Sequence, residues 1–221
     1  RFSAIRTPEM ALSSVKIVGS GLIGTSIGLA LSARGIKVAM SDVDQAAAFL
    51  AQSLVDADAN FESTHAFDVV VLAVPPSEFK KALAEEIKLN ALSTFVDILS
   101  IKTKPLLQVQ SLGTVASRYV GTHPMAGREV SGPQSARGDL FDGRTWILTS
   151  GETTSPTSKD LASEMVTLCG GILVHMKPEE HDQAMALISH TPLILASLLA
   201  SQLVGNNPQW LGLIGQGFKD V

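Results

Sequence analysis

The chain has 221 residues, of which 45% are hydrophobic and 17% charged, with a formal net charge of −4 at pH 7. This length suits one domain of roughly 150 to 200 residues plus part of a second. The acidic balance and the lack of a dense lysine and arginine cluster argue against nucleic-acid binding. A single cysteine, Cys169, excludes an internal disulfide framework, so we expect a cytoplasmic protein.

The chain carries no clear signal for a membrane or for export. Its first residues, R-F-S-A-I-R-T-P-E-M, lack the apolar core of a signal peptide. The longest apolar run, residues 192–205, is interrupted by Ser and Gln and is too short to span a bilayer. We therefore expect a soluble protein in which this run forms a helix buried against other protein.

Residues 1–13 show no periodicity and are predicted to be a tail. From residue 14 onward, short β-branched runs alternate with longer helical patterns. The predicted strands are Val15–Val18, Lys37–Met40, Val69–Val74, Thr94–Asp97, Tyr119–Gly121, Trp146–Thr149 and Ile172–Val174. The predicted helices between them lie near residues 22–34, 44–54, 78–88 and 158–169.

Continuous apolar strands such as D-V-V-V-L-A-V are typical of a parallel sheet that helices cover on both faces. The alternation predicts an α/β, doubly wound, mostly parallel sheet of the Rossmann type over residues 14–177. From Pro178 to Val204 only helix signals remain, and G-N-N-P ends that segment. Residues 178–221 are therefore predicted to begin a second, all-helical domain, of which only the start is present.

The first predicted strand runs directly into G-S-G-L-I-G, which places glycines at Gly19, Gly21 and Gly24 before a helix. In a dinucleotide site, the first glycine allows the tight turn and the second lets the backbone approach a pyrophosphate. The third allows close packing of helix on strand. The N–H groups at the helix start then favour the phosphates. Glycine turns also serve packing alone, but the strand and helix on either side favour a cofactor here.

An acid follows the second predicted strand. Asp42 lies 18 residues after Gly24, and its carboxylate can accept the ribose hydroxyls of NAD while repelling a 2′-phosphate. Asp44 could take the same role or cap the next helix. Strand 69–74 ends at the same edge, where the prolines also serve to end the strand and Ser77 could cap a helix. The predicted NAD contacts are Gly19, Ser20, Gly21, Leu22, Ile23, Gly24, Asp42, Val74 and Pro75.

Three stretches contain polar side chains suited to chemistry. They supply Asp97, Ser100 and Lys102 after one strand, His123 after the next, and His181, Asp182, Ser189 and His190 on the first helix of the second domain. Residues just past strand ends line the ligand crevice of such a sheet, so Ser100 and His123 should lie close together. Each also has a plainer interpretation, with Ser100 as a helix cap, Lys102 as a solvated charge and Asp97 as a partner of turn amides.

The histidines need separate consideration. His181 and His190 are nine residues apart, about 900° around a regular helix, so they should face opposite ways and no metal site is expected. An isolated histidine is more often structural, but His123 stands in a turn fixed by glycine and proline at a strand end. From the residues alone we predict an NAD-dependent enzyme with a histidine base and an unidentified substrate.

Taken together, these motifs resemble the prephenate/arogenate dehydrogenase family of tyrosine biosynthesis. The resemblance covers about residues 15–221. It rests on G-S-G-L-I-G-T-S at 19–26, V-D-I-L-S-I-K at 96–102, G-T-H-P-M-A-G at 121–127, G-D-L-F-D-G at 138–143, H-D-Q-A-M-A-L-I-S-H-T-P at 181–192 and G-F-K-D at 217–220. It implies NAD-dependent oxidative decarboxylation of prephenate to 4-hydroxyphenylpyruvate, with a homodimer formed through the helical domain.

By the same resemblance, His123 accepts or polarises the substrate hydroxyl proton. Ser100 hydrogen-bonds that hydroxyl and helps orient His123, His190 lies at the substrate entrance or contacts the substrate, and Gly127 lines the substrate site. The family usually follows its G-F-x-D stretch with a Thr-Arg pair whose arginine holds a substrate carboxylate. This chain stops at Val221, so we expect a fragment that binds NAD but turns over substrate poorly.

Three alternatives stay open. The first is arogenate as substrate, which would favour an acid near the histidine turn. Glu129 is the nearest acid, although an exposed-loop role suits it equally, and Gln134 is neutral. The second is a β-hydroxyacid type of dehydrogenase, but that class places a lysine on the interdomain helix, and none occurs between Pro178 and Val204. The third is a regulatory module that binds NAD without turnover.

Overall fold

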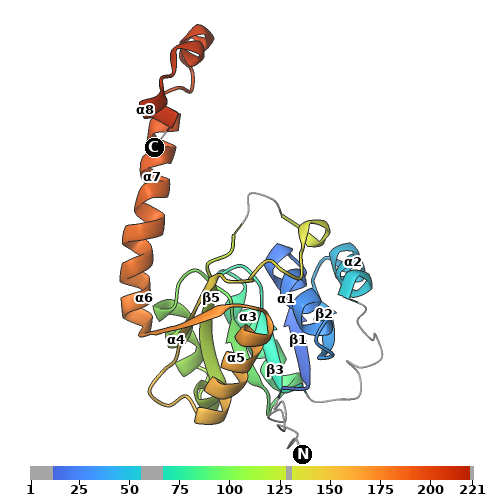
Figure 1. Ribbon diagram of the computed structural model, residues 1–221. Coiled ribbons are helices and arrows are strands. Elements are labelled where there is room, and N and C mark those ends of the chain that lie inside the picture. The colour runs from blue at the N-terminus through green and yellow to red at the C-terminus, as the bar shows by residue number, and fades with distance from the viewer. Residues whose placement is uncertain (1–11, 56–66, 128–130, 220–221) are drawn as a thin grey trace, which may run out of the picture.

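A twisted sheet covered by helices on both faces forms the body of the protein, and one long helix projects from it (Figure 1). The computed structural model describes residues 12–55, 67–127 and 131–219. This architecture confirms the predicted Rossmann-type α/β fold followed by a helical region. Most of the predicted tail, residues 1–11, lies outside the described residues, whereas Leu12 is buried in the core.

Seven strands form the described sheet, in the order β2-β1-β3-β4-β5-β6-β7. The strands are β1 (Ser14–Val18), β2 (Lys37–Ser41), β3 (Val69–Leu72), β4 (Thr94–Asp97), β5 (Tyr119–Pro124), β6 (Thr145–Thr149) and β7 (Ile172–Met176). The first five are parallel, β6 is antiparallel to β5, and β7 is parallel to β6. The chain changes direction across the sheet between β1 and β3, which is where ligands bind in open α/β sheets.

Helices cover the two faces of the sheet and bury two apolar clusters. The helices of the α/β body are α1 (Leu22–Ser32), α2 (Gln45–Val55), α3 (Phe79–Leu89), α4 (Thr103–Gln110) and α5 (Pro156–Leu168), and short 3₁₀ helices lie at Thr114–Arg118, Pro133–Ser135 and Pro208–Leu213. Helices α1, α2 and α5 pack on one face and α3 and α4 on the other. Strand side chains are buried on both faces, as the continuous apolar runs predicted.

Strand β5 is longer than the sequence predicted, and this moves His123. The strand was expected to end at Gly121, with His123 in a turn behind it, but it continues to Pro124. Beyond Gly121, β5 pairs only with the antiparallel β6, and His123 stands opposite Ile147. A proline is tolerated there because β4 no longer pairs with this part of β5, which leaves that side of the strand as an edge. His123 is therefore held by a sheet rather than by a loop.

The helical segment begins directly after β7. Helix α6 (Pro178–Met185), a π-helical turn (Ala186–His190) and α7 (Thr191–Ser201) run on as one continuous helix, and α8 (Gln216–Lys219) follows. The sequence predicted that the apolar run would be buried, but in the single chain α7 has no buried residue among those described. The helix over Pro178–Ser201 has a mean hydropathy of 1.6 and is, by length and composition, long and apolar enough to cross a membrane.

Candidate active site

The glycine turn between β1 and α1 has one crowded side and one open side. Gly19 has φ +109°, and a Cβ at that position would lie 2.2 Å from the carbonyl oxygen of Ala73. A Cβ on Gly24 would lie 2.2 Å from the carbonyl oxygen of Gly19, so helix α1 packs directly on the turn. A Cβ on Gly21 would meet no atom within 4 Å. The open space at Gly21 leaves the start of α1 accessible to a ligand.

Two buried hydroxyls beside this turn lack partners. Ser20 Oγ and Thr25 Oγ1 are both buried, and neither has a hydrogen-bond partner in the described part of the chain. A buried polar group without a partner costs stability, so native proteins usually satisfy it. Leu22 is the first residue of α1 and is buried. The orphaned hydroxyls indicate that this turn is built to meet polar atoms of a bound molecule.

Asp42 lies beside the turn, at the end of β2. One carboxylate oxygen accepts a hydrogen bond from the Ser20 N–H at 2.6 Å, and the other accepts from the Asp44 N–H at 2.9 Å. Asp44 itself accepts from two amides in the first turn of α2, which is a capping contact. A cavity of about 740 Å³ opens here. Its lining includes the predicted cofactor residues Gly19, Gly21, Asp42, Val74 and Pro75.

A second cavity of about 310 Å³ shares Ala73 and Val74 with the first. Its lining also includes Ile23, Pro76, Ile98, Leu99, Ser100, His123, Pro124 and Gly127. The structure thus brings Ser100 and His123 together, as the strand-end argument predicted. The two cavities lie next to each other between Asp42 and His123, an arrangement that suits an elongated ligand such as a dinucleotide.

His123 belongs to a chain of hydrogen bonds that the sequence did not indicate. Its Nδ1 lies 2.9 Å from Nε2 of His181, and the two rings meet edge to face with centroids 5.1 Å apart. His181 is wholly buried, and its Nδ1 lies 2.9 Å from the Asp182 carboxylate. That carboxylate also accepts from the N–H groups of Lys102, at 2.7 Å, and Thr103, at 2.9 Å.

These surroundings set the charges of the chain. Burial above all lowers the pKa of His123 to about 3; electrostatic interaction with Lys102, His181 and His190 also lowers it, and Asp182 opposes this. Burial also lowers the pKa of His181. Burial opposes ionisation of Asp182, but the Thr103 amide, His181 and the Lys102 amide together hold its pKa at about 2. At neutral pH the two imidazoles are therefore neutral and the carboxylate is charged.

Asp97 and Lys102 form a buried ion pair beneath these residues. The plainer interpretation of Lys102 as a solvated charge is wrong, because both side chains are fully buried. The plainer interpretation of Asp97 is confirmed, because its carboxylate accepts from the N–H of Leu99 at 2.7 Å. The Lys102 ammonium donates to the Asp97 carboxylate and to the carbonyl oxygen of Thr122, while the Tyr119 hydroxyl donates to the same carboxylate. Burial lowers the pKa of Lys102 and raises that of Tyr119 well above its ordinary value. This network ties the ends of β4 and β5 together.

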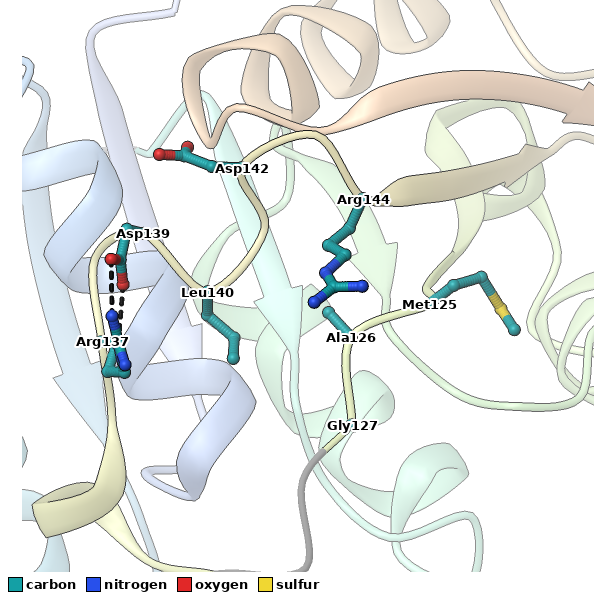
Figure 2. Close-up of a pocket in the computed structure, with 8 residues that line it drawn as sticks. All are labelled: Met125, Ala126, Gly127, Arg137, Asp139, Leu140, Asp142 and Arg144. Atoms are coloured by element: carbon teal, nitrogen blue, oxygen red, sulfur yellow. Dashed lines mark hydrogen bonds and ion pairs between the residues drawn. The ribbon is translucent and has the colours of Figure 1, made fainter. Parts of the chain in front are cut away.

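A third cavity, of about 410 Å³, borders Gly127 on its other side (Figure 2). Arg137 and Asp139 form a bidentate pair on its rim, with distances of 2.8 and 2.7 Å. Arg144, which the sequence did not single out, extends toward Ala126 in the same cavity (Figure 2). It could not be foreseen because nothing near it in sequence distinguishes it from a surface arginine.

The remaining candidates lie farther out. His190 ends the π-helical turn and lines neither of the first two cavities, although it helps to lower the pKa of His123. Ser189 is exposed, and Gln134 contacts the Ser131 carbonyl oxygen on a surface turn. Glu129 lies outside the described residues. Within the described ranges, no group of three or more His, Cys, Asp or Glu side chains is arranged to hold a metal ion.

Known proteins show the same two-part organisation. Residues 27–175 match the family described as the prephenate dehydrogenase nucleotide-binding domain, and residues 177–221 match the prephenate dehydrogenase dimerization domain. Probable prephenate dehydrogenase NovF from Streptomyces niveus is 36% identical over 205 residues, which are 93% of this chain and 56% of that protein. Prephenate dehydrogenase from Bacillus subtilis is 31% identical over 221 residues, 94% of this chain and 59% of that one.

Solved structures agree. Prephenate dehydrogenase from Aquifex aeolicus, in complex with hydroxyphenyl propionate and NAD+, superposes with a TM-score of 0.83 at 28% identity, covering 96% of this chain and 77% of that one. Synechocystis arogenate dehydrogenase gives 0.79 at 26% identity, with 94% and 77% covered. This chain spans 56–59% of the length of the two curated relatives above. By these matches, the chain belongs to the prephenate dehydrogenase family.

Proposed function

We propose that the two adjacent cavities bind NAD, and that the protein catalyses NAD-dependent oxidative decarboxylation of prephenate to 4-hydroxyphenylpyruvate. The observation that carries this proposal is the position of His123, a neutral imidazole in the wall of the cavity that adjoins the glycine turn. The Aquifex aeolicus relative was solved with NAD+ and hydroxyphenyl propionate, which supports both the cofactor and an aromatic product class.

The residues around the glycine turn fit a dinucleotide. The open backbone at Gly21 and the start of α1 suit a pyrophosphate, and the unpartnered hydroxyls of Ser20 and Thr25 can donate to it. Asp42 can accept the ribose hydroxyls, and its negative charge disfavours a 2′-phosphate. When bound, NAD supplies the acceptor for the hydride that leaves the hydroxyl-bearing ring carbon. Val74, which lines both cavities, lies where the ligand would pass from one to the other.

The chain's own groups handle the proton. As the hydroxyl becomes a carbonyl, His123 accepts its proton at Nε2, the ring nitrogen that does not face His181. Ser100, in the same cavity wall, donates to or accepts from the same substrate oxygen. The ring carboxylate departs as carbon dioxide, and its bonding electrons complete the aromatic ring. An imidazole that is neutral at neutral pH is ready for this role without prior deprotonation.

The helical segment and the composition support a proposal for the assembly and location of the protein. We propose a homodimer formed through this segment, since its large apolar side chains lie exposed in the single chain and residues 177–221 match a dimerization domain. A second copy would cover such side chains as Leu193 and Leu198. A cytoplasmic location suits a chain with one cysteine, and the substrate is a small molecule.

The test is NADH production by the full-length protein with prephenate and with arogenate. We expect turnover of prephenate, and a higher kcat/KM for arogenate would reassign the substrate, as the likeness to the Synechocystis enzyme allows. His123→Asn should lose about 10²–10⁴-fold in kcat while NAD affinity is retained. His175→Asn, at an exposed position on β7, is the matched control. If His123→Asn kept most of its kcat, the proposed mechanism would be wrong, and NAD binding without turnover in the parent would indicate a regulatory module.

A further inference from the structure

The chain of hydrogen bonds behind His123 has a fixed direction. A charged carboxylate can only accept, so Asp182 requires His181 to carry its proton on Nδ1. The Nε2 of a neutral His181 is then a bare acceptor, and it lies 2.9 Å from Nδ1 of His123. His123 must therefore donate from Nδ1, which leaves the lone pair of its Nε2 free. Each step follows from the one before it, and the direction originates at Asp182.

We propose that His181 and Asp182 are positioning residues that hold His123 in the tautomer with a proton on Nδ1 and a lone pair on Nε2. This inference rests on the proposed function, because the tautomer matters only if Nε2 of His123 meets a substrate hydroxyl. The opposite tautomer would present an N–H to that hydroxyl and could not accept its proton. The arrangement extends the logic of the serine protease triad, in which an aspartate sets the tautomer of a single histidine.

The anchoring of Asp182 explains how the direction is maintained. Its carboxylate accepts from the N–H groups of Lys102 and Thr103 at the start of α4, so three contacts, with two amides and one imidazole, leave it little freedom to rotate. Asp182 and His181 belong to α6, whereas His123 belongs to β5. The tautomer of the base is therefore set only while α6 is docked on the α/β body.

Several charges act on this chain from the surrounding elements. Lys102 on the β4–α4 connection and His190 on the π-helical turn act to lower the pKa of His123, while Asp182 acts to raise it. Asp97, at the end of β4, acts on His181 together with Lys102 and Asp182. Burial, the largest influence, keeps both imidazoles neutral despite the nearby carboxylates, and the fixed donor order requires this.

Three substitutions in the full-length protein separate positioning from packing. Asp182→Asn offers an amide N–H to His181 and so permits the reversed order, and we expect kcat to fall about 10²–10⁴-fold. His181→Gln can place a side-chain oxygen near the former Nε2, accept from His123 Nδ1–H and keep kcat within about tenfold of the parent. His181→Leu offers no hydrogen-bond acceptor, so its kcat should fall as far as that of Asp182→Asn. Asp160→Asn, at an exposed position on α5, controls for loss of a carboxylate.

The direct readout is the tautomer of His123, measured from its side-chain ¹⁵N shifts with NAD bound. We expect a protonated Nδ1 in the parent and in His181→Gln, and a loss of that state in Asp182→Asn and His181→Leu. An unchanged tautomer or unchanged kcat in Asp182→Asn overturns the inference. The inference is also overturned if His181→Gln retains NAD affinity but loses as much kcat as His181→Leu. Because His123→Asn tests the base itself, activity in that variant would refute the proposed function rather than this positioning role.

Discussion

Acid should destabilise the folded protein through His123, and the size of the effect can be worked from its burial. The folded state holds the pKa of His123 at about 3, against an ordinary value of 6.5 in the unfolded chain. Between these values the unfolded chain binds a proton that the folded chain does not, so stability falls as pH falls below 6.5. At pH 5 the imidazole of the unfolded chain is almost fully protonated. The unfolding free energy at pH 5 is therefore about 2 kcal/mol lower than at pH 8, since each pH unit below the pKa of the unfolded chain is worth about 1.36 kcal/mol.

The measurement compares urea unfolding of the full-length protein with that of His123→Gln at pH 8 and at pH 5. Glutamine does not titrate, so the variant should lack this part of the acid loss. The drop in unfolding free energy from pH 8 to pH 5 should therefore be about 2 kcal/mol larger in the parent. His175→Gln, at an exposed position, should behave as the parent does. Equal acid losses in the parent and in His123→Gln would refute the argument that burial keeps this imidazole neutral.

Three further outcomes are expected. With the pKa of His123 lowered to about 3, kcat/KM should stay level from pH 8 down to about pH 5, and a fall centred near pH 6.5 in the pH–rate profile would contradict this. Lys102→Met should lower the unfolding free energy in urea by about 3–5 kcal/mol because it leaves a buried carboxylate unpaired, and adding Asp97→Leu should recover much of the loss. Gly19→Ala should lower Tm, because Gly19 has φ +109° and the carbonyl oxygen of Ala73 leaves no room for a Cβ there. Gly21→Ala should leave Tm unchanged but weaken NAD binding measured by calorimetry.

The elements whose formation depends on nearby residues could be predicted from sequence. The strand and helix alternation and the glycine turn fall into this class, because their signals lie within a few residues of one another. Helix α4 was missed because the carboxylate that accepts from its first amides belongs to Asp182, about 80 residues later. The extension of β5 was missed because it depends on pairing with β6, which the residues around His123 do not reveal.

The candidate site divides in the same way. Ser100 and His123 could be placed together because parallel strands end at one edge of the sheet. The contact of His123 with His181 joins residues 58 positions apart on different elements. No local sequence pattern predicts this contact. The adjacent residues His181 and Asp182 indicated only that a carboxylate stands next to a histidine in the sequence. The burial of Lys102 was equally hidden, since a lysine after a strand is usually solvated.

The π-helical turn at Ala186–His190 also affects how the protein can change over time. A π turn winds more slowly than an α-helix, so the angle between His181 and His190 differs from the half-turn expected of a regular helix. A π turn holds about one residue more than an α-helical turn, so removing one residue from it would restore α-helical winding with little rotation of α7. Removing a residue elsewhere in the helix would instead rotate the segment beyond it by about 100°. The π turn therefore absorbs one additional residue while α6 stays docked and the apolar side chains of α7 keep their direction.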